Sequence, residues 1–335
     1  MPLSKIQLSS STGRRNLVIN GAMQVAQRAT SASGKTSSGY YVCDRWLFAN
    51  TSQGTWTISQ STTTPSGFAN SLKFDCTTAD GTTNASDQLG LDTRIESRDL
   101  VRLNYGTSSA KTITVSFHVR SNKTGTYTFE AYAQDPNRGF SKTYTIDSAD
   151  TWEKKVITIP GDTAASANFN DDNGIGFQLK WWLAAGSTFT GGTYADNVWD
   201  ANTNANRVSP SNVNLADSTS NEWYITGVQV EIGSSATEFE HRSFGEELQL
   251  CQRYFHKETY GNTYGPFFCQ YTPEYRFAHI WHPVKMRAIP TSTFTSNESS
   301  SEYESTESHF KAYVTEADTS STSKYITAYQ ADADF

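Results

Sequence analysis

The chain has 335 residues, a formal net charge of −7 and only 18% charged residues. Acidic residues outnumber lysine and arginine, so the composition excludes the basic surface that binds nucleic acid or anionic lipid. No apolar run approaches the roughly 20 residues of a membrane-spanning helix, and we expect no membrane insertion. An aromatic content of 13%, with abundant serine and threonine, is typical of a β-rich protein on an outer surface.

The N-terminal segment and the cysteines indicate the compartment in which the protein is made and the state of its thiols. Residues 1–10 lack the apolar run of a secretory signal, so we expect synthesis in a cytoplasm and transport outward on a particle. The cysteines form no CxxC pair, and we therefore predict buried free thiols in place of a metal site or a disulfide framework. They are Cys43, Cys76, Cys251 and Cys269.

Alternating apolar and polar residues predict many short β-strands. Residues 113–119 alternate strictly, residues 127–132 repeat the pattern after Gly125, and we expect a hairpin between the two. Further strands are expected over residues 16–20, 45–49, 56–59, 71–74, 143–146, 156–159 and 325–329. Many strands at short spacing, with no helix between them, predict an all-β chain with one jelly-roll sandwich over residues 16–240.

Two later strands carry more specific signals. Residues 177–183 alternate in the same way, which places Trp181 and Trp182 on opposite faces of a sheet. The alternation of residues 223–232 changes phase at Gly227. We therefore predict a β-bulge at that glycine.

One helix follows the sandwich. Ser243, with Glu246 three residues later, forms a capping box, so we expect a connecting helix within residues 241–257. A small C-terminal β domain is expected over residues 258–335. The apolar side of the helix, at steps of four, three and four, consists of Phe244, Leu248, Cys251 and Phe255. This seam either packs on the helix's own domain or lies at an oligomer axis.

Short motifs follow one another in order along nearly the whole chain. They include residues 16–28 (NLVINGAMQVAQR), 44–46 (DRW), 225–233 (ITGVQVEIG), 239–242 (FEHR), 286–291 (MRAIPT) and 329–335 (YQADADF). Together they resemble a family of bacteriophage virion proteins, tail fibres and spikes with a carbohydrate-binding-module-like jelly roll. The resemblance implies a place on the virion, a homotrimer, and an arm over residues 1–15 that attaches to other virion proteins.

Sugar binding requires exposed aromatic faces beside side chains that hydrogen-bond to hydroxyl groups. Strand parity puts Trp182, Tyr132 and His118 on the polar faces of their strands, with Gln178 and Glu130. If these strands share a sheet, the five residues form one sugar-binding patch. The alternative is that this face packs against a neighbouring subunit or the C-terminal domain.

A long loop over residues 186–221 is the second candidate. It carries Tyr194 and Trp199 among glycine, asparagine and aspartate residues, and loops of this length are often functional. The alternative is an ordinary cover over one end of the sandwich.

No cofactor is expected. Residues 170–174 (NDDNG) resemble half of a calcium loop but lack the later bidentate glutamate, so a plain turn is favoured and structural calcium is not supported. The six histidines show no metal-binding spacing.

Three functions remain open on the sequence. The favoured one is attachment to a host-surface polysaccharide, without catalysis. The second is a purely structural virion decoration or adaptor. The third is a glycan depolymerase, which needs two carboxylates across a cleft; Glu96, Glu130 and Glu153 lie near strands, but strand parity does not pair them.

Overall fold

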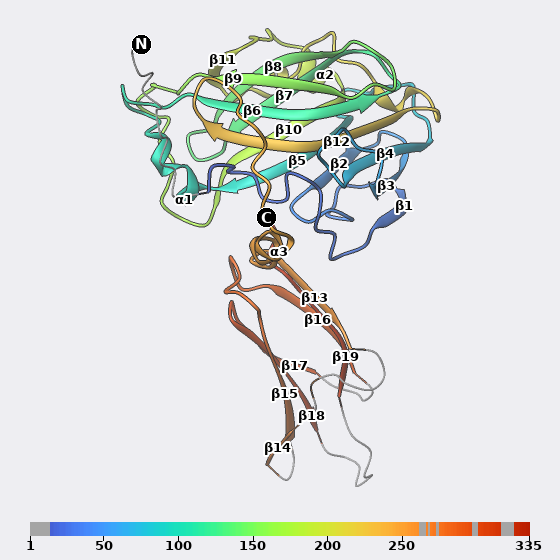
Figure 1. The fold of residues 1–335 in the computed structure, drawn as a ribbon, viewed down its shortest axis with the longest axis vertical. Coiled ribbons are helices and arrows are strands. Elements are labelled where there is room, and N and C mark those ends of the chain that lie inside the picture. The colour runs from blue at the N-terminus through green and yellow to red at the C-terminus, as the bar shows by residue number, and fades with distance from the viewer. Residues whose placement is uncertain (1–13, 261–265, 267–268, 273–274, 297–300, 316–324) are drawn as a thin grey trace, which may run out of the picture.

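Two layers of antiparallel strands form the larger part of the molecule in the computed structural model (Figure 1), which describes residues 14–260, 266, 269–272, 275–296, 301–315 and 325–335. The first sheet has the order β1 (Ser31–Lys35), β3 (Thr55–Ser61), β4 (Ser71–Thr78), β12 (Glu222–Ile232), β6 (Ile113–Ser121) and β9 (Glu153–Ile159). The second has the order β11 (Val198–Ala201), β8 (Arg138–Ile146), β7 (Gly125–Ala133), β10 (Ile175–Ala185), β5 (Gln88–Glu96) and β2 (Leu47–Thr51). The predicted all-β jelly-roll sandwich is confirmed.

Short turns of helix connect some of these strands. They are α1 (Ser97–Leu100), η1 (Val101–Leu103), α2 (Ser187–Thr190), η2 (Asn204–Asn206) and η3 (Leu215–Asp217). No helix among the described residues has the length and hydropathy of a bilayer span.

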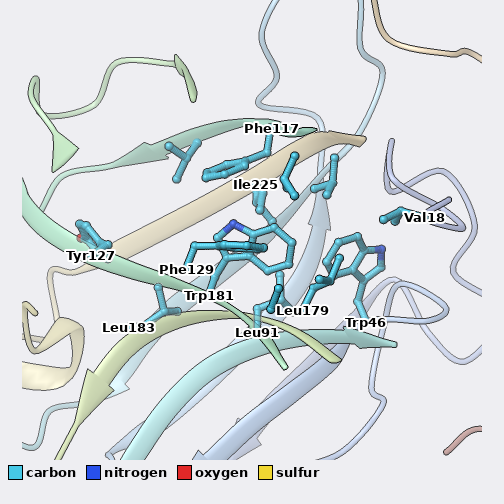
Figure 2. Packing of buried hydrophobic residues seen from close by; sticks show 14 of the residues in the cluster. Val18, Trp46, Leu91, Phe117, Tyr127, Phe129, Leu179, Trp181, Leu183 and Ile225 are labelled. Carbon is cyan, nitrogen blue, oxygen red and sulfur yellow. The ribbon is translucent and has the colours of Figure 1, made fainter. Parts of the chain in front are cut away.

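The core lies between the two sheets and is centred on Trp181 (Figure 2). Its indole contacts the rings of Phe117 from the first sheet and Phe129 from the second, at centroid distances of 5.6 and 5.1 Å. Trp46 lies 5.7 Å from the same indole. Burial of each such aromatic side chain stabilises the fold by roughly 2–3 kcal/mol. The apolar faces of the alternating strands therefore pack against each other between the two sheets.

The hairpin predicted between residues 113–119 and 127–132 is wrong. β6 pairs with β12 and β9 in the first sheet, whereas β7 pairs with β8 and β10 in the second. The short link after β6 therefore crosses from one layer to the other. Period-two alternation identifies the buried face of a strand but not its partner, because both sheets bury the same kind of face.

The strand predicted over residues 16–20 is also wrong, since residues 16–17 are irregular and residues 18–20 form bends. The Asn16 amide accepts hydrogen bonds from the backbone N–H of Val18 and of Val230 and donates to the carbonyl of Val228. Asn20 adopts a positive φ of 58°. One backbone bond of 2.9 Å joins the Leu17 N–H to the Val230 carbonyl, and side-chain bonds of Asn16 take the place of the neighbouring ladder bonds, so the segment follows β12 without forming a strand.

The β-bulge predicted at Gly227 is confirmed. The pairing of β12 with β6 shifts register between Thr226 and Gln229, and Gly227 has a φ of 62°. Glycine adopts this left-handed conformation at little cost.

Helix α3 (Phe244–Gln252) follows the sandwich and begins with the predicted capping box of Ser243 and Glu246. Below it in Figure 1 lies an elongated C-terminal unit of two sheets. One sheet has the order β13 (Phe255–Thr259), β19 (Ile326–Asp332) and β16 (Thr291–Ser296). The other has the order β14 (Cys269–Thr272), β15 (Tyr275–Trp281), β18 (His309–Thr315) and β17 (Ser301–Ser305).

The predicted seam is not one face of a helix. Cys251 is fully buried with Ile19, Val25 and Tyr254, and Phe255 already belongs to β13, where it is buried as well. These two side chains are enclosed by the chain's own residues and cannot contact another subunit. Phe244 is 57% exposed and Leu248 is half-buried against the same cluster as Cys251. The helix packs on its own sandwich.

Hydrogen-bonded charges join the C-terminal unit to the sandwich. Glu96 at the end of β5 accepts two bonds of 2.8 Å from the Arg253 guanidinium and one of 2.6 Å from the Tyr254 hydroxyl. Asp334 pairs with Arg28 and Arg45 of the sandwich. Because buried charges are tolerated only when paired, these contacts fix the two units against each other.

Three of the predicted free thiols are confirmed as buried and unpaired, namely Cys43, Cys76 and Cys251. The side chain of Cys269 and the predicted arm up to residue 13 lie outside the described residues.

Candidate functional site

The patch predicted around Trp182 is internal. Trp182 is fully buried and Glu130 is 1% exposed, although both lie on the outward face of the second sheet. The loop over residues 186–221 covers them: the Phe189 ring lies 5.1 Å from the Trp182 ring, and Arg207 forms an ion pair of 2.7 Å with Glu130. These two side chains therefore cannot reach a sugar in this structure.

Tyr132 and Gln178 remain half-buried beside this covered region, opposite each other on β7 and β10. The Tyr132 hydroxyl donates to Asn137 at 3.0 Å, and the Gln178 amide donates to the buried Asp92 at 2.5 Å. Without Trp182 beside them, they offer one half-buried ring, and the Arg207 guanidinium lies 5.9 Å from the centroid of that ring.

The segment over residues 186–221 acts as a cover, but it is not one long loop as predicted: it contains the edge strand β11, which carries Trp199, and the short helices α2, η2 and η3. Trp199 stacks on Phe177 at 6.1 Å with an interplanar angle of 13°, and its indole N–H donates to the carbonyl of Pro160 at 2.7 Å. The Tyr194 hydroxyl donates to Asp196 at 3.0 Å. Both predicted aromatics are thus held by the chain's own residues.

His118 lies on the other side of the sandwich. It belongs to β6 in the first sheet, whereas Trp182 and Tyr132 belong to the second, so the five residues do not form one patch. This error has the same cause as the wrong hairpin, because the prediction assumed that β6 and β7 share a sheet.

His118 instead lines a separate pocket of about 410 Å³ on the outer face of the first sheet. Its walls are aromatic. The Phe68 ring lies 5.3 Å from His118, 5.1 Å from Phe239 and 5.3 Å from His241. Phe239 and His241 are 4.9 Å apart. We call this group of four rings the aromatic pocket.

The bulge of β12 shapes the floor of the aromatic pocket. A β-carbon added to Gly227 would lie 2.6 Å from Cζ of Phe68 and 2.9 Å from Nδ1 of His118. Only a residue without a side chain lets both rings approach the strand so closely. Lys154 lies opposite His118 on the neighbouring strand β9.

Polar groups surround the rings. They come from Ser66, Ser116, Lys154, Thr237 and Glu238. Burial, and then the positive charge of Lys154, lowers the pKa of His118, so its imidazole is neutral at neutral pH. The Nδ1 atom of His118 has no hydrogen-bond partner among the described residues. The pocket thus combines aromatic walls with convergent polar groups, and both kinds of group occur in small-ligand sites.

The sequence reasoning missed Phe68, Phe239 and His241. Phe68 follows Ser66 and Gly67 in the loop between β3 and β4, and the other two follow β12 in the motif FEHR. An aromatic residue beside glycine in a strand connection was the available signal, because such loops reach over the sheet edge.

No group of three or more histidine, cysteine or acidic side chains in the described ranges is arranged to hold a metal ion. Residues 170–174 form a local turn, in which the backbone N–H of Gly174 donates to the Asp172 carboxylate at 2.9 Å.

Comparison with models of protein families found no match. No curated protein matches the chain either.

Solved structures match part of the chain at low identity and low TM-score. A putative sugar-binding protein from Bacteroides thetaiotaomicron has a TM-score of 0.35 and 14% identity, and the match covers 65% of this chain and 100% of that one. The enzymatically active domain of tailspike protein 4 from bacteriophage CBA120 has a TM-score of 0.33 and 11% identity, over 65% of this chain and 21% of that one. TmCBM61, solved with β-1,4-galactotriose, has a TM-score of 0.32 and 9% identity, over 66% and 100%.

Proposed function

We propose that this chain is a bacteriophage virion protein, a tail fibre or spike, that attaches to a host-surface glycan through the aromatic pocket. The observation that carries the proposal is the gathering of Phe68, Phe239 and two imidazoles around one open cavity. The motifs that resemble phage fibres support the place on the virion, and the low-charge, aromatic-rich composition supports an outer surface.

The chemistry of the pocket suits a saccharide. Phe68 and Phe239 meet edge to face, so an open ring face covers the apolar C–H side of a pyranose. The neutral His118 and the hydroxyl of Thr237 hydrogen-bond to sugar hydroxyls, and Lys154 and Glu238 extend the polar rim.

We propose binding without catalysis. Hydrolysis of a glycosidic bond generally requires two carboxyl groups that face each other across the sugar. Among the described residues that line the aromatic pocket, Glu238 alone carries a carboxylate. This composition favours adhesion over a depolymerase.

We further propose a homotrimer, on the resemblance to three-fold fibres and not on the helix seam, of which two members are buried. Three weak sites on one assembly raise the avidity for a repetitive glycan without any new contact. Sedimentation equilibrium at micromolar concentration tests the trimer, and a monomer contradicts it.

The pocket is tested by adsorption of the purified protein to host cells and by a glycan array. Phe68→Ala and Phe239→Ala are each expected to weaken binding about tenfold, since a stacked aromatic contributes roughly 0.5–1.5 kcal/mol beyond its buried area. Tyr132→Ala is the matched control, because Tyr132 is a half-buried aromatic on the opposite sheet. Equal binding by the parent and both pocket variants contradicts the proposal. If Tyr132→Ala alone loses glycan binding, the binding site lies on the second sheet and not in the aromatic pocket.

A further inference from the structure

A second group of aromatic side chains lies on the C-terminal unit, far along the chain from the aromatic pocket. β15 alternates: Ala278 and Ile280 are buried in the core of the unit, whereas Phe277, His279 and Trp281 have the opposite parity and face outward. Trp281 is 65% exposed. An indole so open to solvent on a regular strand buries little of its apolar surface within the unit, and its free face is available to a ligand.

The neighbouring strand completes this surface. In the antiparallel register of β15 with β18, Trp281 lies opposite His309, and His279 lies opposite Lys311. The ring centroids of His279 and Trp281 are 4.5 Å apart, those of His279 and His309 are 4.6 Å apart, and those of Trp281 and His309 are 5.2 Å apart. We call these three rings the Trp281 platform. Mutual packing holds the indole in place before any ligand arrives, which lowers the entropic cost of binding.

The charges beside the Trp281 platform are already compensated. Lys311 donates to Glu304 at 2.6 Å, and Nε2 of His309 lies 3.6 Å from the same carboxylate. The hydroxyl of Thr306 bonds to Nδ1 of His309 at 3.1 Å and so orients that ring. Paired charges leave hydrogen-bonding capacity but little net field, which favours a neutral ligand over a charged one.

His279 adds a neutral polar ring. Burial lowers the pKa of His279, and the nearby His309 and Lys311 lower it further, against a smaller opposite effect of Glu304. A neutral imidazole both donates and accepts hydrogen bonds, as sugar hydroxyls do.

A second protein chain is a poor occupant for this surface. Stable protein interfaces bury about 800 Å² on each partner around an apolar centre. In the described part of the C-terminal unit, the exposed large hydrophobic residues are Trp281 and Ile289 alone. Ile289 precedes β16, in the other sheet of the unit. One indole between imidazoles and paired charges matches a single sugar ring in size and chemistry.

We propose that the Trp281 platform is a second saccharide-binding site, which stacks a pyranose of a neutral polysaccharide on the Trp281 indole and hydrogen-bonds its hydroxyls to His279 and His309. It is independent of the aromatic pocket, which lies on the sandwich. Two sites on one chain let a single polysaccharide bind at both, and the second contact then forms at high effective concentration.

The test uses the full chain in native gels that contain a soluble polysaccharide, where binding retards migration. The probes are neutral β-1,4-galactan, mixed-linked β-glucan and dextran, with alginate as the charged comparison. We expect Trp281→Ala to weaken retention by a neutral polysaccharide about five- to tenfold, and Trp281→Phe to restore most of it, because a smaller ring still stacks. Ile289→Ala is the matched control, since Ile289 is equally exposed at 67% and lies outside the platform.

The outcomes separate this site from the aromatic pocket. Loss in Trp281→Ala with full binding in Phe68→Ala supports the platform and contradicts the pocket, whereas the reverse result overturns the platform alone. A further loss in the double variant supports two independent sites. The inference is also overturned if the parent is retained by no neutral polysaccharide, if alginate alone retains it, or if Trp281→Ala changes the sedimentation mass, which would make this face a subunit contact.

Discussion

The indole N–H of Trp182 donates a hydrogen bond of 2.8 Å to Oε2 of Glu130, and neither side chain reaches solvent. The same carboxylate forms a two-pronged pair with Arg207, from Nε to Oε1 at 2.7 Å and from Nη2 to Oε2 at 3.0 Å. The face of the second sheet that carries Trp182 and Glu130 is polar in sequence but is buried in the structure. The segment over residues 186–221 covers it and supplies Arg207, whose positive charge compensates that of Glu130.

Arg207→Met is expected to destabilise the protein by about 3–5 kcal/mol, because it leaves the buried Glu130 carboxylate without its charge partner. Urea unfolding followed by tryptophan fluorescence measures the change. Adding Glu130→Gln to Arg207→Met should recover a large part of the loss, since a neutral amide still accepts the bond from Trp182. Additive effects of the two substitutions would contradict a coupled pair.

Gly227→Ala is expected to close the aromatic pocket. The added methyl group meets Phe68 at 2.6 Å and His118 at 2.9 Å, so both rings must shift and glycan binding should fall below detection in the cell-adsorption assay. Gly34→Ala is the control: its φ of 68° matches the 62° of Gly227, but nothing lies within 4 Å of the new methyl group. Both variants bear the left-handed backbone cost of about 1 kcal/mol, and only Gly227→Ala should lose binding. Equal binding by the two would show that the pocket is not the site.

Some features of this fold can be predicted from local sequence, and others cannot. Alternation correctly predicts which residues of a strand face the core, and the capping box of Ser243 and the bulge at Gly227 follow from local chemistry. The pairing of β6 with β12, and not with β7, depends on contacts about a hundred residues apart, which no local pattern contains. The covering of Trp182 by the loop over residues 186–221 is a long-range contact of the same kind.

The platform and pocket rings illustrate the same limit. Alternation places His118 on the polar face of its strand, but its partners Phe68 and Phe239 come from connections before β4 and after β12. Trp281 and His309 belong to β15 and β18, which pair although β16 and β17 lie between them in the sequence. Residue types suited to sugar binding are visible in the sequence, whereas the sets that act together are defined only by the fold.

Glu96→Gln is expected to loosen the C-terminal unit from the sandwich. Burial raises the pKa of Glu96, but the hydrogen bonds from Arg253 and Tyr254 outweigh it and hold the pKa below its usual value. The amide cannot accept both guanidinium bonds, and loss of a charge-assisted bond costs about 1.5–3 kcal/mol. Hydrogen exchange of α3 and β13 should accelerate while exchange of β6 and β10 is unchanged. Equal protection of α3 and β13 in parent and variant would contradict this role.

The C-terminal unit is expected to lose stability in mild acid because of His256. This imidazole is 1% exposed in its side chain, and burial, with a smaller effect of His282, lowers its pKa to about 4 against the opposing effect of Glu258. Between about pH 6.5 and pH 4 the unfolded chain binds a proton that the folded chain does not, so stability falls as the pH falls through that window. In His256→Gln, which keeps a donor for the 2.9 Å contact with Glu258, this dependence should shrink by roughly 2–3 kcal/mol. Urea midpoints of parent and variant at pH 8 and pH 4.5 measure it, and the pH 8 pair controls for packing changes. Parallel pH profiles of the two proteins would mean that His256 takes up its proton equally in the folded and unfolded chain.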